Sequence, residues 1–397
     1  MRTASPHIVV GTNKWYLGGV NTYAQNLVDG FIQAGRSAEL LLTNDPLAVE
    51  QAPLDRPNSI PFNELPKSNL STWKRRWKRL DNYLSEKGSC IYLPNQDRAF
   101  SCASPMLSDS IKIVGVAHAD EDYHYEHIER MGDYWNAIVC VSPLIAKNAR
   151  SYFPKLADKI VSIPNSVPCP SKPPSRKVSE TLRIIYAGRL SQYQKRILDI
   201  PSIVQALYRN DTNFEMTIAG QGKDEEELQK RIAVIDKGKR VRFVGTLANE
   251  RVLKEFATHD VFLLTSDFEG LPVALVEAMA RGCIPVVSRV KSGVTDLVKH
   301  NTNGLIFEIG DYKRCAELLA TLSNDKEKKK TLSASSYEAL KAGRFSQREQ
   351  ISNYLDLFRN LETQKRWKRI RGPAVRAQYF DPTLKGEIKR HVTRLLK

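Results

Sequence analysis

The sequence of 397 residues lacks several features that would direct its interpretation elsewhere. No apolar run approaches the ~20 residues that a membrane-spanning helix needs. Six cysteines are present and none is spaced as Cys-x-x-Cys, which favours reduced thiols over metal ligands or disulfides. The first stretch, Met1–Asn13, has one arginine before a short apolar strand and does not resemble a signal peptide. We therefore expect a cytoplasmic protein, or one attached to a membrane from the cytosolic side.

The sequence also lacks the Gly-x-Gly-x-x-Gly turn of dinucleotide-binding domains. A nicotinamide-dependent oxidoreductase needs this turn and a downstream acid, so that class is excluded. Hydrophobic residues make up 42% and charged residues 26% of the chain, as in globular proteins. The formal net charge of +16 calls for an anionic partner, which could be nucleic acid, a membrane surface or a phosphate-bearing substrate.

Short apolar runs alternate with helical stretches along most of the chain. The predicted strands are His7–Gly11, Ala38–Thr43, Cys90–Pro94, Ile111–Ala117, Ala137–Val141, Ile160–Ile163, Leu182–Ala187, Phe214–Ala219, Val241–Val244, Val261–Leu264, Cys283–Val287 and Gly304–Phe307. Continuous apolar runs are typical of strands buried on both faces of a parallel sheet. The segment Pro164–Lys177 is rich in proline and serine and marks a domain boundary. The sequence thus predicts two doubly wound α/β halves, with the active site between them at the carboxyl ends of the strands.

One segment of the second half carries two glutamates in an otherwise apolar crossover between strands. Pro272 starts its helix, because a fixed φ and a missing N–H suit the first helical position, and Gly282 ends it. Glu269 lies in the turn before the helix, and Glu277 lies in the helix. A helix N-terminus binds anions, so a phosphate site is predicted at Gly270, Leu271, Pro272 and Val273. The helix dipole accounts for one glutamate near this end but not for both.

This segment resembles the Glu-x7-Glu signature of retaining glycosyltransferases of family four, the glycosyl transferases group 1. The residues around the two glutamates, Phe268–Pro272 and Glu277–Ala280, match the family's sequence pattern there. The resemblance covers the chain to about residue 361 and implies the α/β GT-B fold, in which two Rossmann-like doubly wound domains face a central cleft. The implied parts are an N-terminal acceptor domain (1–170), a linker (171–180), a C-terminal donor domain (181–346), a terminal helix crossing back to the first domain (347–361) and a basic extension (362–397).

The resemblance also gives roles to charged residues. Arg189 and Lys195 follow a predicted strand end, where a diphosphate needs neutralising, and they match the family's Arg…Lys pair. Glu277 would bind the ribose and Glu269, as a catalytic residue, the transferred sugar. Arg196 stands where glycine is commoner in the family, and its role stays open.

Three residues of the first half join the predicted site. Gly18 and Gly19 match a glycine-rich loop that faces the donor phosphate and the acceptor in the family. His118 follows the strand Ile111–Ala117 and matches a histidine near the transferred sugar, with a structural hydrogen bond as the alternative role.

Four positions after strands of the second half are expected near the nucleotide: Gly220, Gly222, Thr246 and Leu247. No metal or other cofactor is expected. Asp120-Glu121-Asp122 offers the Asp-x-Asp of metal-dependent transferases, and His124 and His127 lie nearby, but the spacing fits no standard ligand set.

Basic residues cluster around tryptophans at two places. The apolar stripe of Trp73, Trp77, Leu80 and Leu84 is flanked by cations that include Arg75 and Arg76, and the tail from Lys365 repeats this chemistry. Such a helix suits an anionic membrane surface, or else its stripe packs on its own sheet. No recognised nucleic-acid module accompanies the clusters, so nucleic acid is the less favoured partner.

The sequence therefore predicts a metal-independent, retaining transferase. It would move a sugar from a nucleotide-diphosphate sugar to the hydroxyl of a saccharide or lipid-linked acceptor, in cell-surface polysaccharide, lipopolysaccharide or glycolipid synthesis. Two alternatives stay open: a nucleotide-sugar epimerase on the same fold, and a degenerate sugar-binding protein without catalytic activity.

Overall fold

The computed structural model describes residues 5–16, 18–46, 56–67, 71–175, 179–341, 343–363 and 370–372. These residues form two compact units. The first unit contains the described residues within Met1–Val141, Ile145–Ile163 and Ile351–Lys397, and the second contains those within Ser142–Leu144 and Pro164–Gln350.

A parallel sheet of seven strands forms the centre of the first unit. In chain order the strands are β1 (His7–Thr12), β2 (Ala38–Leu42), β3 (Phe62–Glu64), β4 (Cys90–Pro94), β5 (Ile111–Ala117), β6 (Ala137–Cys140) and β7 (Ile160–Ser162). Their spatial order is β3-β2-β1-β4-β5-β6-β7. The direction of winding therefore reverses between β1 and β4, which is the point where doubly wound sheets bind ligands.

The second unit has a parallel sheet of six strands: β8 (Leu182–Ala187), β9 (Phe214–Ala219), β10 (Val241–Gly245), β11 (Val261–Leu264), β12 (Ile284–Ser288) and β13 (Leu305–Phe307). Their order is β10-β9-β8-β11-β12-β13, so the winding reverses between β8 and β11. The twelve strands predicted from sequence are present with ends within one residue. The edge strand β3 was missed, because its three residues are partly or fully exposed and form no apolar run.

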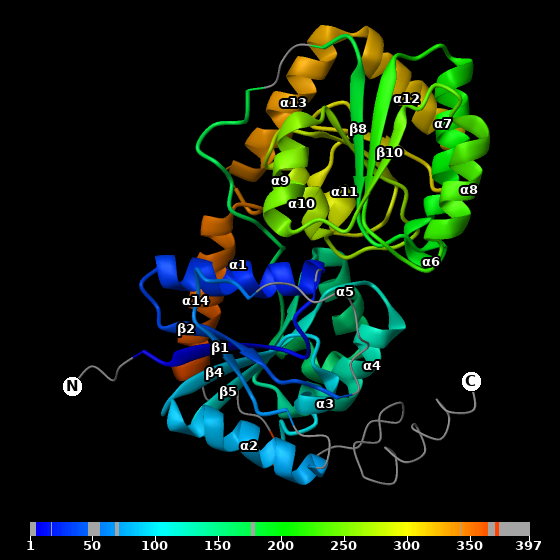
Figure 1. Cartoon of the computed structure of the whole chain (residues 1–397). Coiled ribbons are helices and arrows are strands. Elements are labelled where there is room, and N and C mark those ends of the chain that lie inside the picture. Colours follow the sequence, from blue (N-terminus) through cyan, green and yellow to red (C-terminus); the bar gives the residue numbers. More distant parts are fainter. Residues whose placement is uncertain are drawn as a thin grey trace, which may run out of the picture. The chain divides into compact units, whose positions relative to one another are not determined.

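Helices cover both faces of each sheet (Figure 1). Those of the first unit are α1 (Gly19–Gln33), α2 (Trp73–Glu86), α3 (Arg98–Ser101), α4 (Asp122–Met131), most of α5 (Pro143–Tyr152), and α14 (Gln347–Thr363) from Ile351 onward, with 3-10 turns η1 (Gly132–Tyr134) and η2 (Pro154–Lys159). The rings of Tyr354 and Phe358 on α14 pack against Phe31 of α1, with centroids 5.8 and 5.5 Å away. Aromatic contacts thus attach α14 to α1 within the first unit.

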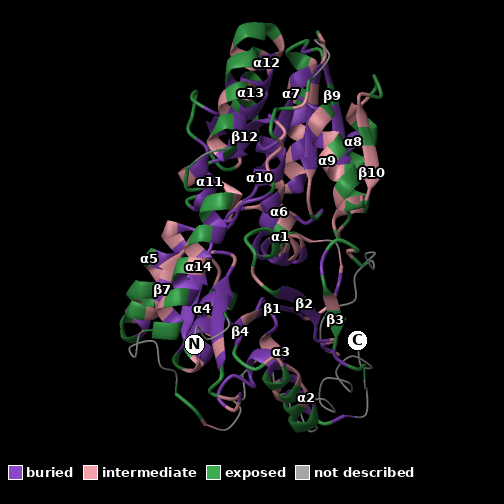
Figure 2. Cartoon of the chain, turned by 90° about the vertical axis from the view of Figure 1, so that its left-hand side faces the viewer, coloured by how far each residue is buried: buried purple, intermediate pink, exposed green. Residues whose placement is uncertain are grey.

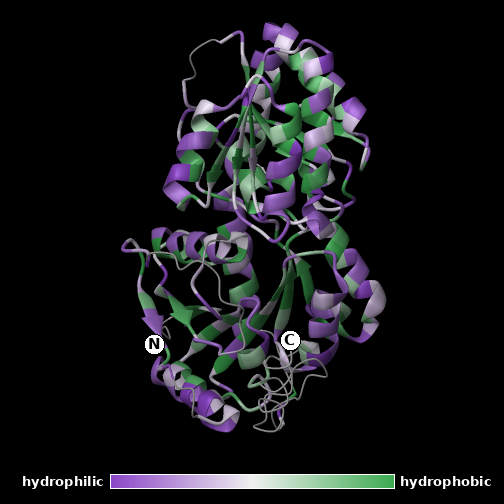
Figure 3. Cartoon of the chain, turned by 45° about the vertical axis from the view of Figure 1, so that its right-hand side comes forward, coloured by the Kyte–Doolittle hydropathy of each residue, from purple (hydrophilic) through white to green (hydrophobic). Residues whose placement is uncertain are grey.

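The helices of the second unit are α6 (Gln192–Lys195), α7 (Ile200–Arg209), α8 (Glu225–Ile235), α9 (Asn249–Thr258), α10 (Val273–Met279), α11 (Gly293–Leu297), α12 (Tyr312–Asn324) and α13 (Lys326–Lys341), with the turn η3 (Ile197–Asp199). In Figure 1, α7, α8 and α12 lie on one side of its strands, and α9, α10 and α13 on the other. Figure 2 shows the strands buried between these layers, and Figure 3 shows that they are the hydrophobic part of each unit. The apolar strands predicted from sequence therefore form the core.

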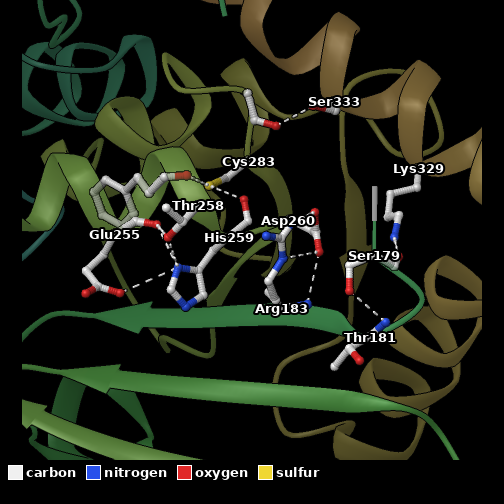
Figure 4. A network of polar contacts seen from close by, with 12 residues as sticks. Ser179, Thr181, Arg183, Glu255, Thr258, His259, Asp260, Cys283, Lys329 and Ser333 are labelled. Atoms are coloured by element: carbon white, nitrogen blue, oxygen red, sulfur yellow. Dashed lines mark hydrogen bonds and ion pairs between the residues drawn. The ribbon is translucent and has the colours of Figure 1, made fainter. Parts of the chain in front are cut away.

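A polar network joins β8 and β11 at their amino ends, away from the edge where ligands bind (Figure 4). Asp260 precedes β11 and accepts hydrogen bonds from the backbone N–H (3.0 Å), Nε (3.2 Å) and Nη2 (3.0 Å) of Arg183 on β8. His259 bridges β9 and α9, because its ring nitrogens lie 2.9 Å from Thr217 Oγ1 and 2.6 Å from the carbonyl oxygen of Glu255. These contacts fix the strand ends opposite the candidate site. Among the helices that the structure describes, none is both long enough and apolar enough to cross a bilayer.

Candidate active site

Two loops meet where the winding of the second sheet reverses. Arg189 follows β8, and Glu269 follows β11, which is the neighbouring strand. A backbone hydrogen bond joins the loops, since the N–H of Asp267 donates to the carbonyl of Gln194 at 2.9 Å. The side chain of Thr265 also donates to the carbonyl of Lys195 at 2.6 Å. The charged residues predicted on these loops are therefore held at one place.

Lys195 and Glu269 form a direct ion pair, with Nζ 2.5 Å from Oε1. Ser266 donates its hydroxyl to the same carboxylate oxygen at 2.6 Å. The side chains of Lys195 and Glu269 are 15% and 6% exposed. The carboxylate is thus oriented by two donors and largely withdrawn from water, as a group that positions a ligand must be.

Gln194 connects this pair to Arg189. Its Oε1 accepts a hydrogen bond from Arg189 Nη2 at 2.8 Å, and its Nε2 donates to the carbonyl of Phe268 at 3.2 Å. The same amide nitrogen lies 3.5 Å from Glu269 Oε2. Sequence reasoning missed Gln194, although it stands between two residues that were predicted. The structure therefore brings Arg189, Lys195 and Glu269 together through one buried amide.

Glu277 lies on α10 and is bound by a different partner. Asn249, the first residue of α9, donates from Nδ2 to Glu277 Oε1 at 2.7 Å. Burial raises the pKa of the Glu277 carboxyl to about 7, although the hydrogen bond from Asn249 and the charge of Arg281 both lower it. Asn249 follows Thr246, which is exposed, and Leu247, which is half-buried. The predicted nucleotide loop thus leads directly into a contact with Glu277.

Close packing requires glycine at Gly220 and Gly222, the two glycines after β9. The sequence alone did not show this requirement. A Cβ on Gly220 would lie 1.9 Å from the carbonyl oxygen of Gly188, and one on Gly222 would lie 2.1 Å from that of Leu190. Gly220 also has a φ of +133°, which side chains disfavour. The loop after β9 can therefore run against the loop that carries Arg189 only because glycine occupies these two positions.

The helix α10 begins at Val273, with Pro272 at its cap, and Gly282 adopts a left-handed φ of +72° just beyond its end. The predicted start and stop signals are thus confirmed to within about a residue. Gly270 and Leu271 are buried, and Leu271 accepts a hydrogen bond from Asn165 Nδ2 at 2.7 Å. This contact fixes the backbone just before the helix.

Arg196, whose role was open, has a left-handed backbone with a φ of +47°. Its guanidinium is bound by Asp199 at 2.8 Å and by Asp267 at 3.3 Å. Glycine adopts such a φ without strain, so glycine would suit this position better than a residue with a side chain. The charge of Arg196 is therefore engaged within the second unit.

In the first unit, the predicted residues lie near the reversal point between β1 and β4. Gly18 precedes α1, and its carbonyl accepts hydrogen bonds from the N–H groups of Asn21 and Thr22, both at 3.1 Å. His118 follows β5, and its Nε2 lies 2.6 Å from Oδ1 of Asn95, which follows β4. Asn95 in turn donates from Nδ2 to the carbonyl of Val20, next to Gly19, at 3.2 Å. One asparagine, missed from sequence, thus connects the glycine loop to His118.

The fold and its second unit have known counterparts. A crystal structure of a mutant of TarM from S. aureus, in complex with Fondaparinux, alpha-GlcNAc-glycerol and UDP, matches the chain with a TM-score of 0.74 at 12% identity, covering 89% of this chain and 99% of that one. The predicted GT-B fold is therefore confirmed. The family model described as Glycosyl transferases group 1 matches residues 171–339. The matched segment lies within the second unit.

Curated glycosyltransferases resemble the chain over different lengths. The amylovoran biosynthesis glycosyltransferase AmsK of Erwinia amylovora is 37% identical over 150 residues, which are 36% of this chain and 36% of that protein. The lipopolysaccharide core biosynthesis glycosyltransferase LpsD of Rhizobium meliloti is 23% identical over 357 residues, which are 89% of this chain and 97% of that protein. The stronger match thus spans little more than a third of its relative, whereas the weaker one spans nearly all of it.

In the described part of the chain, no group of three or more His, Cys, Asp or Glu side chains could hold a metal ion. Asp120 instead accepts hydrogen bonds from Tyr125 and, at 3.1 Å, from Asn148. His124 and His127 are buried on α4. These three side chains are thus hydrogen-bonded or buried within the first unit.

The apolar stripe of α2 is turned inward. Trp73 and Trp77 are only 3% and 7% exposed, and Arg76 is also buried, with its guanidinium 4.9 Å from the centre of the Trp73 ring. Arg75 is exposed, as are the neighbouring cations Lys74 and Lys78. The interpretation in which the stripe packs on its own unit is the one that the structure shows. Most of the basic tail lies outside the described residues.

Proposed function

We propose that the protein is a retaining glycosyltransferase that moves a sugar from a nucleotide-diphosphate sugar to an acceptor hydroxyl. The observation that carries this proposal is the cluster of Arg189, Gln194, Lys195 and Glu269 at the reversal point of a doubly wound sheet. Two cations and an oriented carboxylate suit a ligand with an anionic diphosphate and a polyhydroxylated sugar. The match of residues 171–339 to the family model described as Glycosyl transferases group 1 supports the same reaction.

The departing diphosphate needs positive charge in a site that excludes water. Arg189 can bind two phosphate oxygens at once, and Lys195 supplies a mobile point charge. In the turn Gly270–Val273, the backbone N–H groups of Gly270, Leu271 and Val273 would add further donors, whereas Pro272 has none. These groups together would stabilise the leaving group without a metal ion, so we propose metal-independent transfer with no cofactor.

The two glutamates would hold the two sugars of the donor. Glu269, fixed by Lys195 and Ser266, would accept hydrogen bonds from hydroxyls of the transferred sugar, and Glu277 would do so from the ribose. The base would lie by Thr246 and Leu247, because the same loop supplies Asn249, the partner of Glu277. None of these residues is an evident covalent nucleophile. Retention would then follow from attack of the acceptor on the face that the diphosphate leaves.

The names of the relatives guide the choice of acceptor. AmsK is named for amylovoran biosynthesis and LpsD for lipopolysaccharide core biosynthesis. A saccharide or lipid-linked acceptor in cell-surface polysaccharide, lipopolysaccharide or glycolipid synthesis is therefore proposed, with the protein in the cytoplasm or on the cytosolic face of the membrane. The exposed cations Lys74, Arg75 and Lys78 of α2 would provide attraction to anionic lipid without insertion.

A ligand screen followed by a transfer assay tests the proposal. A nucleoside diphosphate or nucleotide sugar that binds only the native state raises the melting temperature of the full chain. With that donor, product should form only when an acceptor is added, and NMR of the product should show the anomeric configuration of the donor. Conversion of the donor sugar without acceptor would indicate an epimerase instead. If no nucleoside diphosphate raised the melting temperature, the proposal would be wrong.

A further inference from the structure

His118 is held by contacts from three other elements of the first unit. Asn95 contacts its Nε2 at 2.6 Å from the loop after β4. The ring of Tyr23 on α1 meets the imidazole edge to face, with centroids 4.9 Å apart and an interplanar angle of 87°. The ring of His124 on α4 lies 6.1 Å away. Rotation of the imidazole would break these contacts together.

The orientation of Asn95 follows from its second partner. The carbonyl of Val20 can only accept a hydrogen bond, so the group that faces it at 3.2 Å is the amide nitrogen of Asn95. The amide oxygen then faces His118, and an amide oxygen only accepts. The proton of this contact must therefore be on Nε2 of His118. In a neutral imidazole, Nδ1 then carries a lone pair.

The surroundings favour the neutral ring. Burial lowers the pKa of the His118 imidazole to about 4 from an ordinary value of 6.5. The titratable side chains packed on it are those of Tyr23 and His124, and the pKa of His124 is also lowered by burial. Tyr23 in turn shares a hydrogen bond with the hydroxyl of Tyr354 on α14. The contacts thus supply no carboxylate that would stabilise an imidazolium.

We propose that Asn95 is a positioning residue that holds His118 as the Nε2–H tautomer, so that Nδ1 accepts a hydrogen bond from a substrate hydroxyl. This inference rests on the proposed sugar transfer. In this role His118 is a neutral hydrogen-bond acceptor that orients the substrate. It neither donates a proton nor carries charge. It also extends the functional set of the first unit to a residue without contact to substrate.

The tautomer can be read directly by NMR, independently of activity. In protein labelled with ¹⁵N-histidine, long-range ¹H–¹⁵N spectra distinguish protonated from unprotonated ring nitrogens, and His118→Gln identifies the signals of His118. The wild type should show Nε2 protonated and Nδ1 unprotonated at neutral pH. Asn95→Asp keeps an acceptor and adds a negative charge, so it should raise the titration midpoint of His118 by at least about one unit. Asn95→Leu removes the acceptor and should give a mixture of tautomers.

Kinetics then separate positioning from folding. Asn95→Leu should lower kcat about tenfold or more with the native fold retained, and Asn95→Asp should recover activity as pH rises above the new midpoint. The matched control is Asn136→Leu, because Asn136 is another buried asparagine of the first unit, which accepts from the N–H of Ile113 at 2.8 Å. The control should lower the melting temperature and leave kcat unchanged.

The outcomes distinguish this inference from the proposed function. An Nδ1–H tautomer in the wild type, or unchanged spectra and kcat in Asn95→Leu, would overturn the role of Asn95 even if transfer is observed. The expected spectra in a protein that transfers no sugar with any donor would instead overturn the proposed function, and with it the substrate hydroxyl as the partner of Nδ1.

Discussion

The ammonium group of Lys195 lies 2.5 Å from the carboxylate of Glu269, and both side chains are mostly buried. A cation that is paired in this way cannot serve as a free counter-ion for phosphate until the pair rearranges. The carboxylate retains Ser266 as a second donor, so it is not left without a partner if Lys195 turns away. The proposed donor would thus exchange one buried ion pair for another.

This pairing separates the effects of Lys195 on activity and on stability. Lys195→Met should reduce transfer at least about a hundredfold, because a donor aimed at the leaving group is lost. It should also lower the melting temperature, because Glu269 loses its buried counter-ion. In Lys195→Met/Glu269→Gln the melting temperature should recover and the activity should not. Calorimetry and a coupled assay for nucleoside diphosphate release measure the two effects.

Lys230→Met is the matched control, since Lys230 makes an exposed ion pair with Glu226 on α8. It should change neither quantity appreciably, as exposed pairs contribute about 1 kcal/mol or less. Normal turnover in Lys195→Met would remove Lys195 from the proposed site.

The sheets and the charged residues could be predicted from sequence for a physical reason. Strands buried on both faces need continuous apolar runs, and a parallel sheet places the residues after its strands along one edge. Arg189 and Glu269 follow two strands that are neighbours in the second sheet, so the strand order alone brings them close. Gln194 connects the two side chains, and its amide has no sequence signal of its own.

Other features depend on which face of an element packs inward. The stripe of Trp73 and Trp77 has the same helical spacing whether it meets lipid or its own unit, and only the structure shows both rings buried. Asn95 and Asn249 were missed because a single asparagine after a strand, or at a helix start, is usually a turn or cap residue. Their role becomes visible only when the partner, His118 or Glu277, is seen beside them.

Glu277 should make stability depend on pH. Burial raises the pKa of its carboxyl in the folded chain to about 7 from 4.5, so the folded state binds this proton more tightly than the unfolded state. The contribution is therefore fully favourable below pH 4.5 and is lost as pH rises through about 7, by up to about 3 kcal/mol. Glu277→Gln cannot ionise and should be more stable than the wild type at pH 8 but not at pH 4. Melting temperatures across this range measure the difference.

The exposed Glu226 of α8 provides the control, and Glu226→Gln should leave the pH dependence unchanged. Proton release on ligand binding provides a second test. Ribose hydroxyls would stabilise the carboxylate form, so a nucleoside diphosphate that binds at pH 6 should release protons, which calorimetry in buffers of different ionisation enthalpy detects. Parallel pH curves for Glu277→Gln and the wild type would show that this carboxyl does not titrate as described.

Arg196 combines an unfavourable backbone with two favourable ion pairs. A left-handed φ costs a residue with a side chain about 1–2 kcal/mol, whereas glycine adopts it freely. Arg196→Gly loses the pairs with Asp199 and Asp267 but also loses the strain, so its stability should stay within about 1 kcal/mol of the wild type. Arg196→Ala loses the pairs and keeps the strain, and should melt below Arg196→Gly. Equal melting temperatures of the two variants would contradict the role of the backbone.

The ion pair of Arg183 with Asp260 should contribute to stability without affecting the reaction, because it joins β8 and β11 at the ends opposite the site (Figure 4). Asp260 accepts three hydrogen bonds from Arg183 and is 9% exposed, so Asp260→Ala removes the carboxylate that binds both the backbone N–H and the partly buried guanidinium of Arg183. We expect a loss of about 3 kcal/mol in the free energy of unfolding, with kcat unchanged below the melting transition. The exposed pair of Arg289 with Glu308 is the control, and Glu308→Ala should cost less than about 1 kcal/mol. A fall in kcat for Asp260→Ala at a temperature where the chain is folded would mean that the amino ends of these strands are coupled to the residues at their carboxyl ends.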